Sequence, residues 1–135
     1  MKIYFAGSIR GGRDDVKIYA QIIKLLQNYG EVLTEHIGSV NLMDEGELSI
    51  TDKEIHDRDI KWLLESDVMV AEVTNPSLGV GYEIGRAIEE KKKVICLYRN
   101  LDNQRLSAMI SGNTNITKYC YDSLKDLKQK IYNLL

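Results

Sequence analysis

The sequence predicts a three-layer α/β sandwich, in which helices cover both faces of one parallel, doubly wound sheet. Short apolar runs alternate along the chain with longer stretches of helical periodicity, which is typical of repeated βα units. The apolar runs are almost continuous, as expected for strands that are buried on both faces. The chain has 135 residues, of which 44% are hydrophobic and 28% charged, and this suits a single domain, 1–135.

The expected elements form five βα units. The expected strands are residues 2–6, 31–35, 67–73, 93–98 and 118–121. The expected helices are residues 14–29, 52–66, 80–90, 105–111 and 123–135. Asp52 is expected to cap the second helix, and a long loop is expected over residues 36–51. We expect the strand order 2-1-3-4-5 of flavodoxin-like and Rossmann-like sheets.

This strand order predicts where a ligand binds. The connections reverse direction between the first and third strands, and ligands of such sheets bind beyond the carboxyl ends of the strands that flank this switch point. The two loops at that place are residues 7–13 and 74–79. Candidate functional residues are therefore sought there first.

The loop 7–13 reads GSIRGGR and has the features of an anion site. Gly7 and Gly11 allow backbone N–H groups to approach a ligand closely, and Ser8 and Arg10 add further donors. The loop leads into a helix N-terminus, which attracts anions. It matches neither the Walker A nor the GxGxxG pattern, so the alternative is a turn-rich loop whose arginines are solvated.

The loop 74–79 leads into a helix that carries Glu83. Ser77 can cap this helix or donate to an anion, and Gly79 keeps the turn thin, so that a ligand can come close. Glu83 is expected in the first turn of the helix, where the helix dipole favours the ionised carboxylate. An ionised carboxylate at the switch point is a candidate nucleophile, and the alternative is that it only complements the dipole.

Two polar residues fall on the apolar side of the helix 52–66 when its residues are placed at steps of about 100°. Burial of Asp59 can raise its pKa and keep a proton on it for general-acid catalysis, unless Asp59 pairs with an arginine or caps a backbone group. His56 lies on the same side and is interpreted as a histidine at the edge of the core. His36, near the same crevice, is open to a structural or a binding interpretation.

The charge balance argues against polymeric and membrane partners. Lys and Arg number 18 against 20 Asp and Glu, a net charge of −2, so nothing points to a nucleic-acid polymer or an anionic membrane. No apolar run approaches the roughly 20 residues that span a bilayer. The chain opens on a strand pattern rather than a signal peptide, and Cys96 and Cys120 are expected to be reduced, buried thiols. We therefore expect a cytoplasmic location.

Metal and cofactor chemistry is not expected. The sequence contains no CxxC and no HExxH motif, and two histidines cannot build a common zinc site. A small anionic substrate remains compatible with the sequence, because it needs only a local cluster of positive groups.

Four blocks of the sequence resemble a known family. They are IYFAGSIRGGR at 3–13, VLTEH at 32–36, DVMVAEVTNPSLGVGYEIGRA at 67–87 and LSAMI at 106–110. Together they resemble the 2′-deoxynucleoside 5′-phosphate N-hydrolases, within the nucleoside 2-deoxyribosyltransferase superfamily. The resemblance covers nearly the full length and is weakest over residues 38–53.

The resemblance implies hydrolysis of the N-glycosidic bond of a 2′-deoxynucleoside 5′-monophosphate to a free base and 2-deoxyribose 5-phosphate. It implies that Glu83 is the nucleophile and forms a covalent deoxyribosyl intermediate, that Asp59 assists the leaving base, and that Tyr4 lies beside the reacting sugar. It also implies a homodimer in which the neighbouring subunit lends Ser107 to the phosphate. The candidate substrate-binding residues are Gly7, Ser8, Ile9, Arg10, Gly11, His36, Ser77, Gly79 and Ser107.

Three other functions stay open. A nucleoside 2-deoxyribosyltransferase would use the same Glu83 intermediate with a second base as acceptor, although the phosphate-type donors Arg10, Ser77 and Ser107 favour the hydrolase. A ribonucleotide hydrolase acting on CMP differs only in accepting a 2′-hydroxyl. A non-catalytic nucleotide-binding module is the alternative from another class. The base preference is not predicted.

Overall fold

The computed structural model describes residues 1–9, 15–39, 49–101 and 105–135. Its centre is a parallel five-stranded sheet in the order β2-β1-β3-β4-β5, which confirms the predicted fold class and strand order. The strands are β1 (Lys2–Ala6), β2 (Glu31–Val32), β3 (Val68–Glu72), β4 (Lys93–Tyr98) and β5 (Ile116–Cys120). The helices are α1 (Val16–Leu26), the 3-10 helix η1 (Glu35–Gly38), α2 (Asp52–Glu65), α3 (Leu78–Glu89), α4 (Ala108–Ser111) and α5 (Leu124–Leu134).

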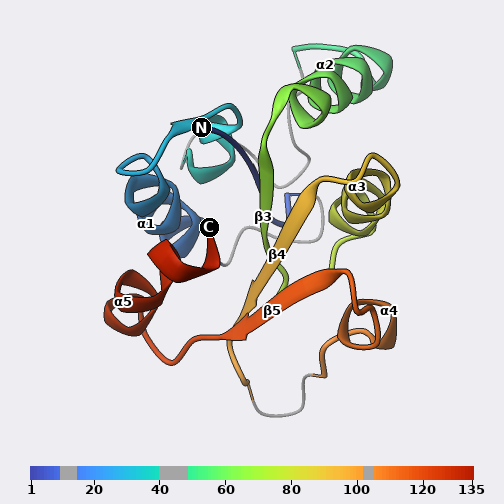
Figure 1. The fold of residues 1–135 in the computed structure, drawn as a ribbon. Coiled ribbons are helices and arrows are strands. Elements are labelled where there is room, and N and C mark those ends of the chain that lie inside the picture. The colour runs from blue at the N-terminus through green and yellow to red at the C-terminus, as the bar shows by residue number, and fades with distance from the viewer. Residues whose placement is uncertain (10–14, 40–48, 102–104) are drawn as a thin grey trace.

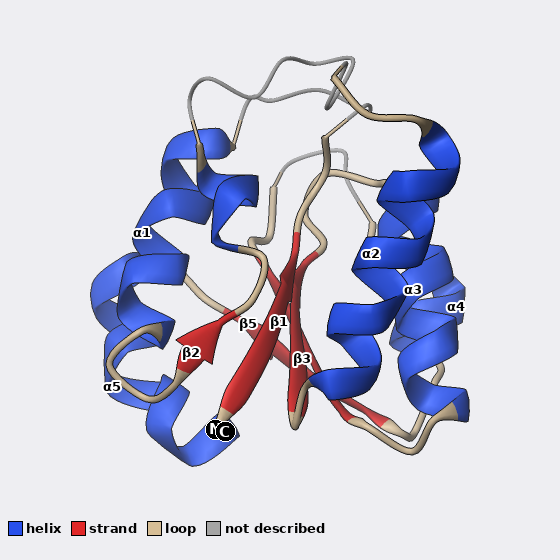
Figure 2. Ribbon diagram, turned by 90° about the horizontal axis from the view of Figure 1, so that it is seen from above, coloured by secondary structure: helices blue, strands red, loops and turns tan. Residues whose placement is uncertain are grey.

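Helices enclose the sheet on both faces. In Figures 1 and 2, α1 and α5 lie on one side of the sheet and α2, α3 and α4 on the other. Each face has its own apolar core, because successive side chains of a strand point to opposite faces. Ile3 and Phe5 of β1 pack towards α1 and α5, whereas Tyr4 and Ala6 pack towards α2 and α3.

The second strand is shorter than the expected 31–35. Its ladder with β1 ends after Val32, because the hydroxyl of Thr34 replaces the next backbone partner. The Thr34 Oγ1 accepts from the Phe5 N–H at 2.8 Å and donates to the Phe5 carbonyl at 2.6 Å. Thr34 is buried, so this exchange satisfies both backbone groups of Phe5 without a continued strand.

Two helix starts differ from the expected ones. Thr51, not Asp52, caps α2, since its hydroxyl accepts from the Glu54 N–H at 3.2 Å. Ser77 caps α3 by accepting from the Val80 N–H at 3.3 Å, so this helix begins at Leu78 rather than at residue 80. Glu83 consequently lies in the second turn of α3, and the expectation that it sits in the first turn was wrong.

One of the two cysteines differs from expectation. Cys96 is a buried free thiol in β4, whereas Cys120 is exposed. Cys120 ends β5, which lies at the edge of the sheet and pairs only with β4. Within the described ranges, no helix is long and apolar enough to cross a membrane.

Candidate active site

A pocket of about 720 Å³ opens at the predicted switch point, beyond the carboxyl end of β1. Side chains from the end of β1, from α2, from the loop before α3 and from the start of α3 line it. Its volume is in the range of pockets that hold small-molecule ligands. The residues predicted from the sequence that line this pocket are Tyr4, Gly7, Ile9, Asp59, Ser77, Gly79 and Glu83.

A hydrogen bond joins Tyr4 and Glu83 within this pocket. The Tyr4 hydroxyl on β1 donates to Oε1 of Glu83 on α3 at 3.0 Å. Burial raises the pKa of Glu83 to about 7, and the negative charge of Asp59 adds to this rise, while the hydrogen bond from Tyr4 opposes it. Burial and the Glu83 charge raise the pKa of Tyr4 as well, so Tyr4 remains a proton donor. Desolvation therefore governs the ionisation of Glu83, rather than the helix dipole that the sequence suggested.

Asp59 lies in the pocket wall on α2, paired with its neighbour Arg58. Oδ1 of Asp59 accepts from Nε of Arg58 at 2.9 Å and lies 2.8 Å from its Nη2. The guanidinium stacks on the ring of Trp62, 4.7 Å from its centroid. The pairing with an arginine, which the sequence analysis named as one alternative, is present in the structure. Such a pair favours the carboxylate, so a general-acid role needs a proton delivered to Asp59 first.

The first turn of α3 leaves open space beside its helix cap. Among the described residues, a Cβ built on Gly79 would meet only the Ser77 hydroxyl, at 3.8 Å, which is an ordinary contact. Packing of the chain therefore does not require a glycine at position 79. Because Gly79 and Ser77 both line the pocket, the absent side chain leaves room for a ligand.

At Gly7, in the first loop, close packing of the chain itself requires a glycine. A Cβ on Gly7 would lie 2.9 Å from the ring of Tyr19, so the close approach here is to α1. The Tyr19 hydroxyl accepts from the Ser8 N–H at 3.1 Å and fixes the backbone where the loop begins. Ser8 is buried and does not line the pocket. Arg10 and Gly11 lie outside the described residues.

Two further predicted residues lie away from the pocket lining. His36, in η1, lies behind Arg58, with 3.4 Å between its Nε2 and Nη2 of Arg58 and with its ring 5.8 Å from that of Trp62. His36 therefore lies near Arg58, the residue that pairs with Asp59, and does not itself line the pocket. Ser107 is exposed and caps α4 by accepting from the Met109 N–H at 3.3 Å.

A buried polar cluster supports the two loops from the opposite face of the sheet. Arg99 pairs with Asp15, where the first loop enters α1, and its backbone N–H donates to the Thr74 hydroxyl at 2.9 Å, where the second loop begins. The Thr74 hydroxyl in turn donates to Glu72, whose pKa is raised by burial. This cluster was not predicted from the sequence, because residues of the cluster are up to 84 positions apart in the chain.

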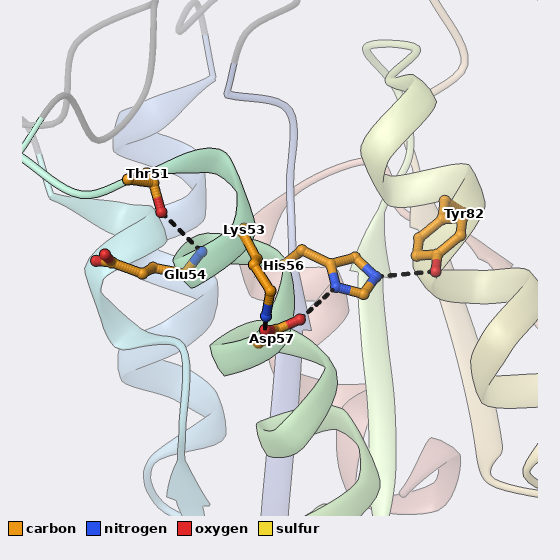
Figure 3. Close-up of polar contacts among 6 residues, drawn as sticks. All are labelled: Thr51, Lys53, Glu54, His56, Asp57 and Tyr82. Atoms are coloured by element: carbon orange, nitrogen blue, oxygen red, sulfur yellow. Dashed lines mark hydrogen bonds and ion pairs between the residues drawn. The ribbon is translucent and has the colours of Figure 1, made fainter.

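His56 departs most clearly from expectation. Its side chain lines the pocket and is 51% exposed, rather than lying at the edge of the core. Figure 3 shows it reaching from α2 towards Tyr82 on α3. The N-terminal half of α2 lines the pocket. Leu63, near the other end, is the one residue of this helix that is fully buried. The apolar side of α2 is therefore partly a pocket wall.

The lining of the pocket combines apolar side chains such as Ile55, Ile60 and Leu78 with the carboxyl groups of Asp52, Asp59 and Glu83. In the part of the chain that the structure describes, no three His, Cys, Asp or Glu side chains are grouped so that they could hold a metal ion.

The chain belongs to the nucleoside 2-deoxyribosyltransferase family, whose sequence model matches residues 3–132. Curated relatives are more specific in name. Two proteins named 5-hydroxymethyl-dUMP N-hydrolase, from Tetraodon nigroviridis and Danio rerio, are each 51% identical to this chain. The alignment with the Tetraodon nigroviridis protein covers 98% of this chain and 98% of that protein. The alignment with the Danio rerio protein covers 100% of this chain and 98% of that protein. The Homo sapiens protein of the same name is 48% identical over 87% of this chain and 68% of its own length.

A solved structure supports the fold. The CMP N-glycosidase of Clostridium botulinum superposes with a TM-score of 0.70, covering 100% of both chains, at 20% sequence identity. At that level of identity the likeness concerns the fold alone.

Proposed function

We propose that this protein hydrolyses the N-glycosidic bond of 2′-deoxynucleoside 5′-monophosphates, releasing the free base and 2-deoxyribose 5-phosphate. The observation that carries the proposal is the Tyr4–Glu83 hydrogen bond in a pocket of nucleotide size at the switch point. The named activity of close relatives, 5-hydroxymethyl-dUMP N-hydrolysis, supports it. A 5′-phosphate on the substrate agrees with the donors of the loop 7–13, although Arg10 lies outside the described residues.

The proposed chemistry proceeds in two steps. Ionised Glu83 attacks C1′ of the sugar and forms an ester bond, while the C1′–N bond breaks and its electron pair leaves with the base. Water then attacks C1′ and releases the sugar phosphate and the Glu83 carboxylate. The hydrogen bond from Tyr4 favours the carboxylate that attacks.

Asp59 is assigned to the leaving base. Asp59, after taking a proton from solvent water, would donate it to the departing nitrogen, and the resulting carboxylate would then take a proton from the attacking water. Because Arg58 pairs with its carboxylate, the approach of the substrate has to exchange that contact. We therefore expect Asp59→Asn to lower kcat more than it raises KM, since the residue acts on the reacting bond rather than on binding alone.

The test is release of free base, followed by chromatography. The substrates are dGMP, dAMP, dCMP, dTMP, 5-hydroxymethyl-dUMP, GMP, CMP and deoxyguanosine, each with Glu83→Ala beside the wild type. We expect a base from at least one deoxynucleoside monophosphate and none from deoxyguanosine. No release from any of them, with wild type and variant alike, would exclude the hydrolase.

The same experiment separates the remaining functions. Release from CMP in place of the deoxynucleotides would indicate a ribonucleotide hydrolase. Formation of a new nucleoside only when a free acceptor base is added would indicate a transferase. Nucleotide binding that survives Glu83→Gln, with no base released by the wild type, would leave a binding module.

We also propose that the active form is a homodimer in which each subunit's Ser107 serves the phosphate in the neighbouring pocket. Ser107 is exposed and lies outside the pocket lining of its own chain. Met109, in the same short helix, is 81% exposed, and an interface formed around Ser107 would cover it. The proposal otherwise rests on the resemblance to the family.

A further inference from the structure

An aromatic pair forms the outer wall of the pocket. His56 from α2 and Tyr82 from α3 both line it, and Nε2 of His56 lies 3.0 Å from the Tyr82 hydroxyl oxygen. Their ring centroids are 5.8 Å apart. Figure 3 shows the two side chains meeting between the helices. Tyr82 is 55% exposed and His56 is similarly open, so the pair lies at the mouth of the pocket rather than in the core.

Polar contacts along α2 fix the orientation of His56. Its Nδ1 lies 3.0 Å from Oδ1 of Asp57, and the second oxygen of Asp57 binds the ammonium group of Lys53. An ionised carboxylate only accepts hydrogen bonds, so a neutral His56 ring carries its hydrogen on Nδ1, and its Nε2 then accepts from the Tyr82 O–H. The Tyr82 oxygen then retains a lone pair that can accept a hydrogen bond from a ligand in the pocket.

The pair lies beside the reacting groups. His56 precedes Asp59 by three residues, so the two share one face of α2 and are separated by about one turn, roughly 5 Å along the axis. Tyr82 directly precedes Glu83. This step rests on the proposed function: when C1′ of a nucleotide faces Glu83 and its leaving base meets Asp59, the far edge of the base extends along α2 towards His56 and Tyr82.

We propose that Tyr82, oriented by His56, determines base specificity by accepting a hydrogen bond from a donor on the edge of the base that is remote from the glycosidic bond. The ligand class is a 2′-deoxynucleoside 5′-monophosphate whose base carries a hydroxyl or amine there. A 5-hydroxymethyl group offers such a donor. The methyl group of dTMP occupies the same position without one.

The test compares 5-hydroxymethyl-dUMP with dTMP, which differ by that one hydroxyl. Binding is measured by calorimetry in a Glu83→Gln background, so that nucleotide is not consumed, and kcat/KM is measured for the wild-type sequence. We expect a preference of roughly 3- to 10-fold for the hydroxymethyl nucleotide, the effect of one hydrogen bond. Tyr82→Phe, which keeps the ring, should abolish the preference for the hydroxymethyl nucleotide.

Two further variants sharpen the result. His56→Ala removes the partner that orients the Tyr82 hydroxyl and should reduce the preference in the same direction. Tyr132→Phe makes the same chemical change on α5, where the side chain is 73% exposed and outside the pocket lining, and should leave the preference intact.

The results that would overturn this inference differ from the result that would exclude the proposed function. A Tyr82→Phe protein that keeps the wild-type preference, or a Glu83→Gln protein that binds both nucleotides equally, would overturn the inference even if base release continues. A preference that depends on Tyr82 in a protein that releases no base would support the inference and exclude hydrolysis instead.

Discussion

Glu83 is the nucleophile of the proposed reaction, and its neighbours shift its pKa in opposite directions. Burial and the charge of Asp59 raise its pKa to about 7, whereas the Tyr4 hydroxyl stabilises the carboxylate. Near neutral pH both forms are therefore populated. Only the carboxylate can attack C1′, so kcat/KM should fall as the pH drops below about 7.

Tyr4→Phe should move this acid limb to higher pH. The substitution removes a hydrogen bond that lowers the pKa of Glu83, and a hydrogen bond to a charged group corresponds to about one pKa unit or somewhat more. The measurement is kcat/KM for base release against pH. Tyr132→Phe serves as the control, and the substrate phosphate titrates equally in all three proteins. An unchanged acid limb in Tyr4→Phe would show that Tyr4 does not tune the nucleophile.

Glu83→Gln should stabilise the fold at high pH. Because the folded-state pKa of about 7 exceeds the ordinary value of 4.5, the native state binds the proton more tightly than the unfolded chain does. The contribution of Glu83 to stability is thus complete below about pH 4.5 and is lost as the pH rises through 7. The difference between the two values corresponds to at most about 3 kcal/mol.

Urea unfolding of both proteins at pH 5 and pH 8 measures this effect. The free energy of unfolding of Glu83→Gln should exceed that of the wild type at pH 8 and approach it at pH 5. A variant that is less stable than the wild type at pH 8 would mean that Glu83 is not desolvated as described.

At the scale of single elements, α2 shows what sequence periodicity reveals and what it conceals. The periodicity placed Asp59 and His56 on the apolar side, and both line the pocket. Periodicity could not distinguish a helix face buried in the core from one that lines a pocket, because apolar residues such as Ile55 and Ile60 are typical of either. Pairing of Asp59 with an arginine was one expectation, but Arg58 could not be named as the partner, since neighbouring residues of a helix do not normally face one another.

Element boundaries were predictable where a side chain caps a helix. Thr51 and Glu54 match the capping-box spacing, a signal present in the sequence although Asp52 was preferred as the cap. The early end of β2 was not predictable, because it depends on Thr34 meeting Phe5 across 29 residues. Local propensity carries no information about such a partner.

The start of α3 allows a direct test of the pocket. Gly79→Ala should leave the stability unchanged or slightly increased, since its Cβ meets no described residue closer than 3.8 Å and alanine favours helix. It should raise KM for a nucleotide roughly tenfold, about 1.4 kcal/mol of lost binding, because the methyl group fills pocket space beside Ser77.

Gly85→Ala is the matched control. Gly85 lies in the same helix and does not line the pocket, and a Cβ there meets nothing within 4 Å in the part of the chain that the structure describes. Steady-state kinetics and urea unfolding of both variants decide the matter. Equal KM values for the two would show that the ligand does not approach Gly79.

At the scale of the whole molecule, strand order located the site. The expected order 2-1-3-4-5 is the one that the structure has, and its switch point identified the segments that reach the pocket through Gly7, Ser77 and Gly79. What the order could not supply is the support beneath them, where Arg99 ties Asp15 to Thr74 from the other face of the sheet.

Subunit complementation tests the proposed dimer. Ser107→Ala and Glu83→Ala each remove one group from a site that we propose is shared between subunits. In mixed dimers, one of the two pockets would combine Glu83 and Ser107 from different chains and be intact. We therefore expect a mixture of the two inactive or weakened proteins, after dissociation and reassembly, to recover base release. A mixture no more active than its parts would place Ser107 in its own subunit's site or in none.

The most direct measurement is the mass of the protein during turnover. After rapid acid quench with a deoxynucleoside monophosphate that is a substrate, intact-mass and peptide analysis should show 2-deoxyribose 5-phosphate, less one water, attached to the peptide that contains Glu83. Glu83→Gln should show no adduct and no base release. A Glu83→Gln protein that releases base at the wild-type rate would contradict the assignment of this carboxylate as the nucleophile.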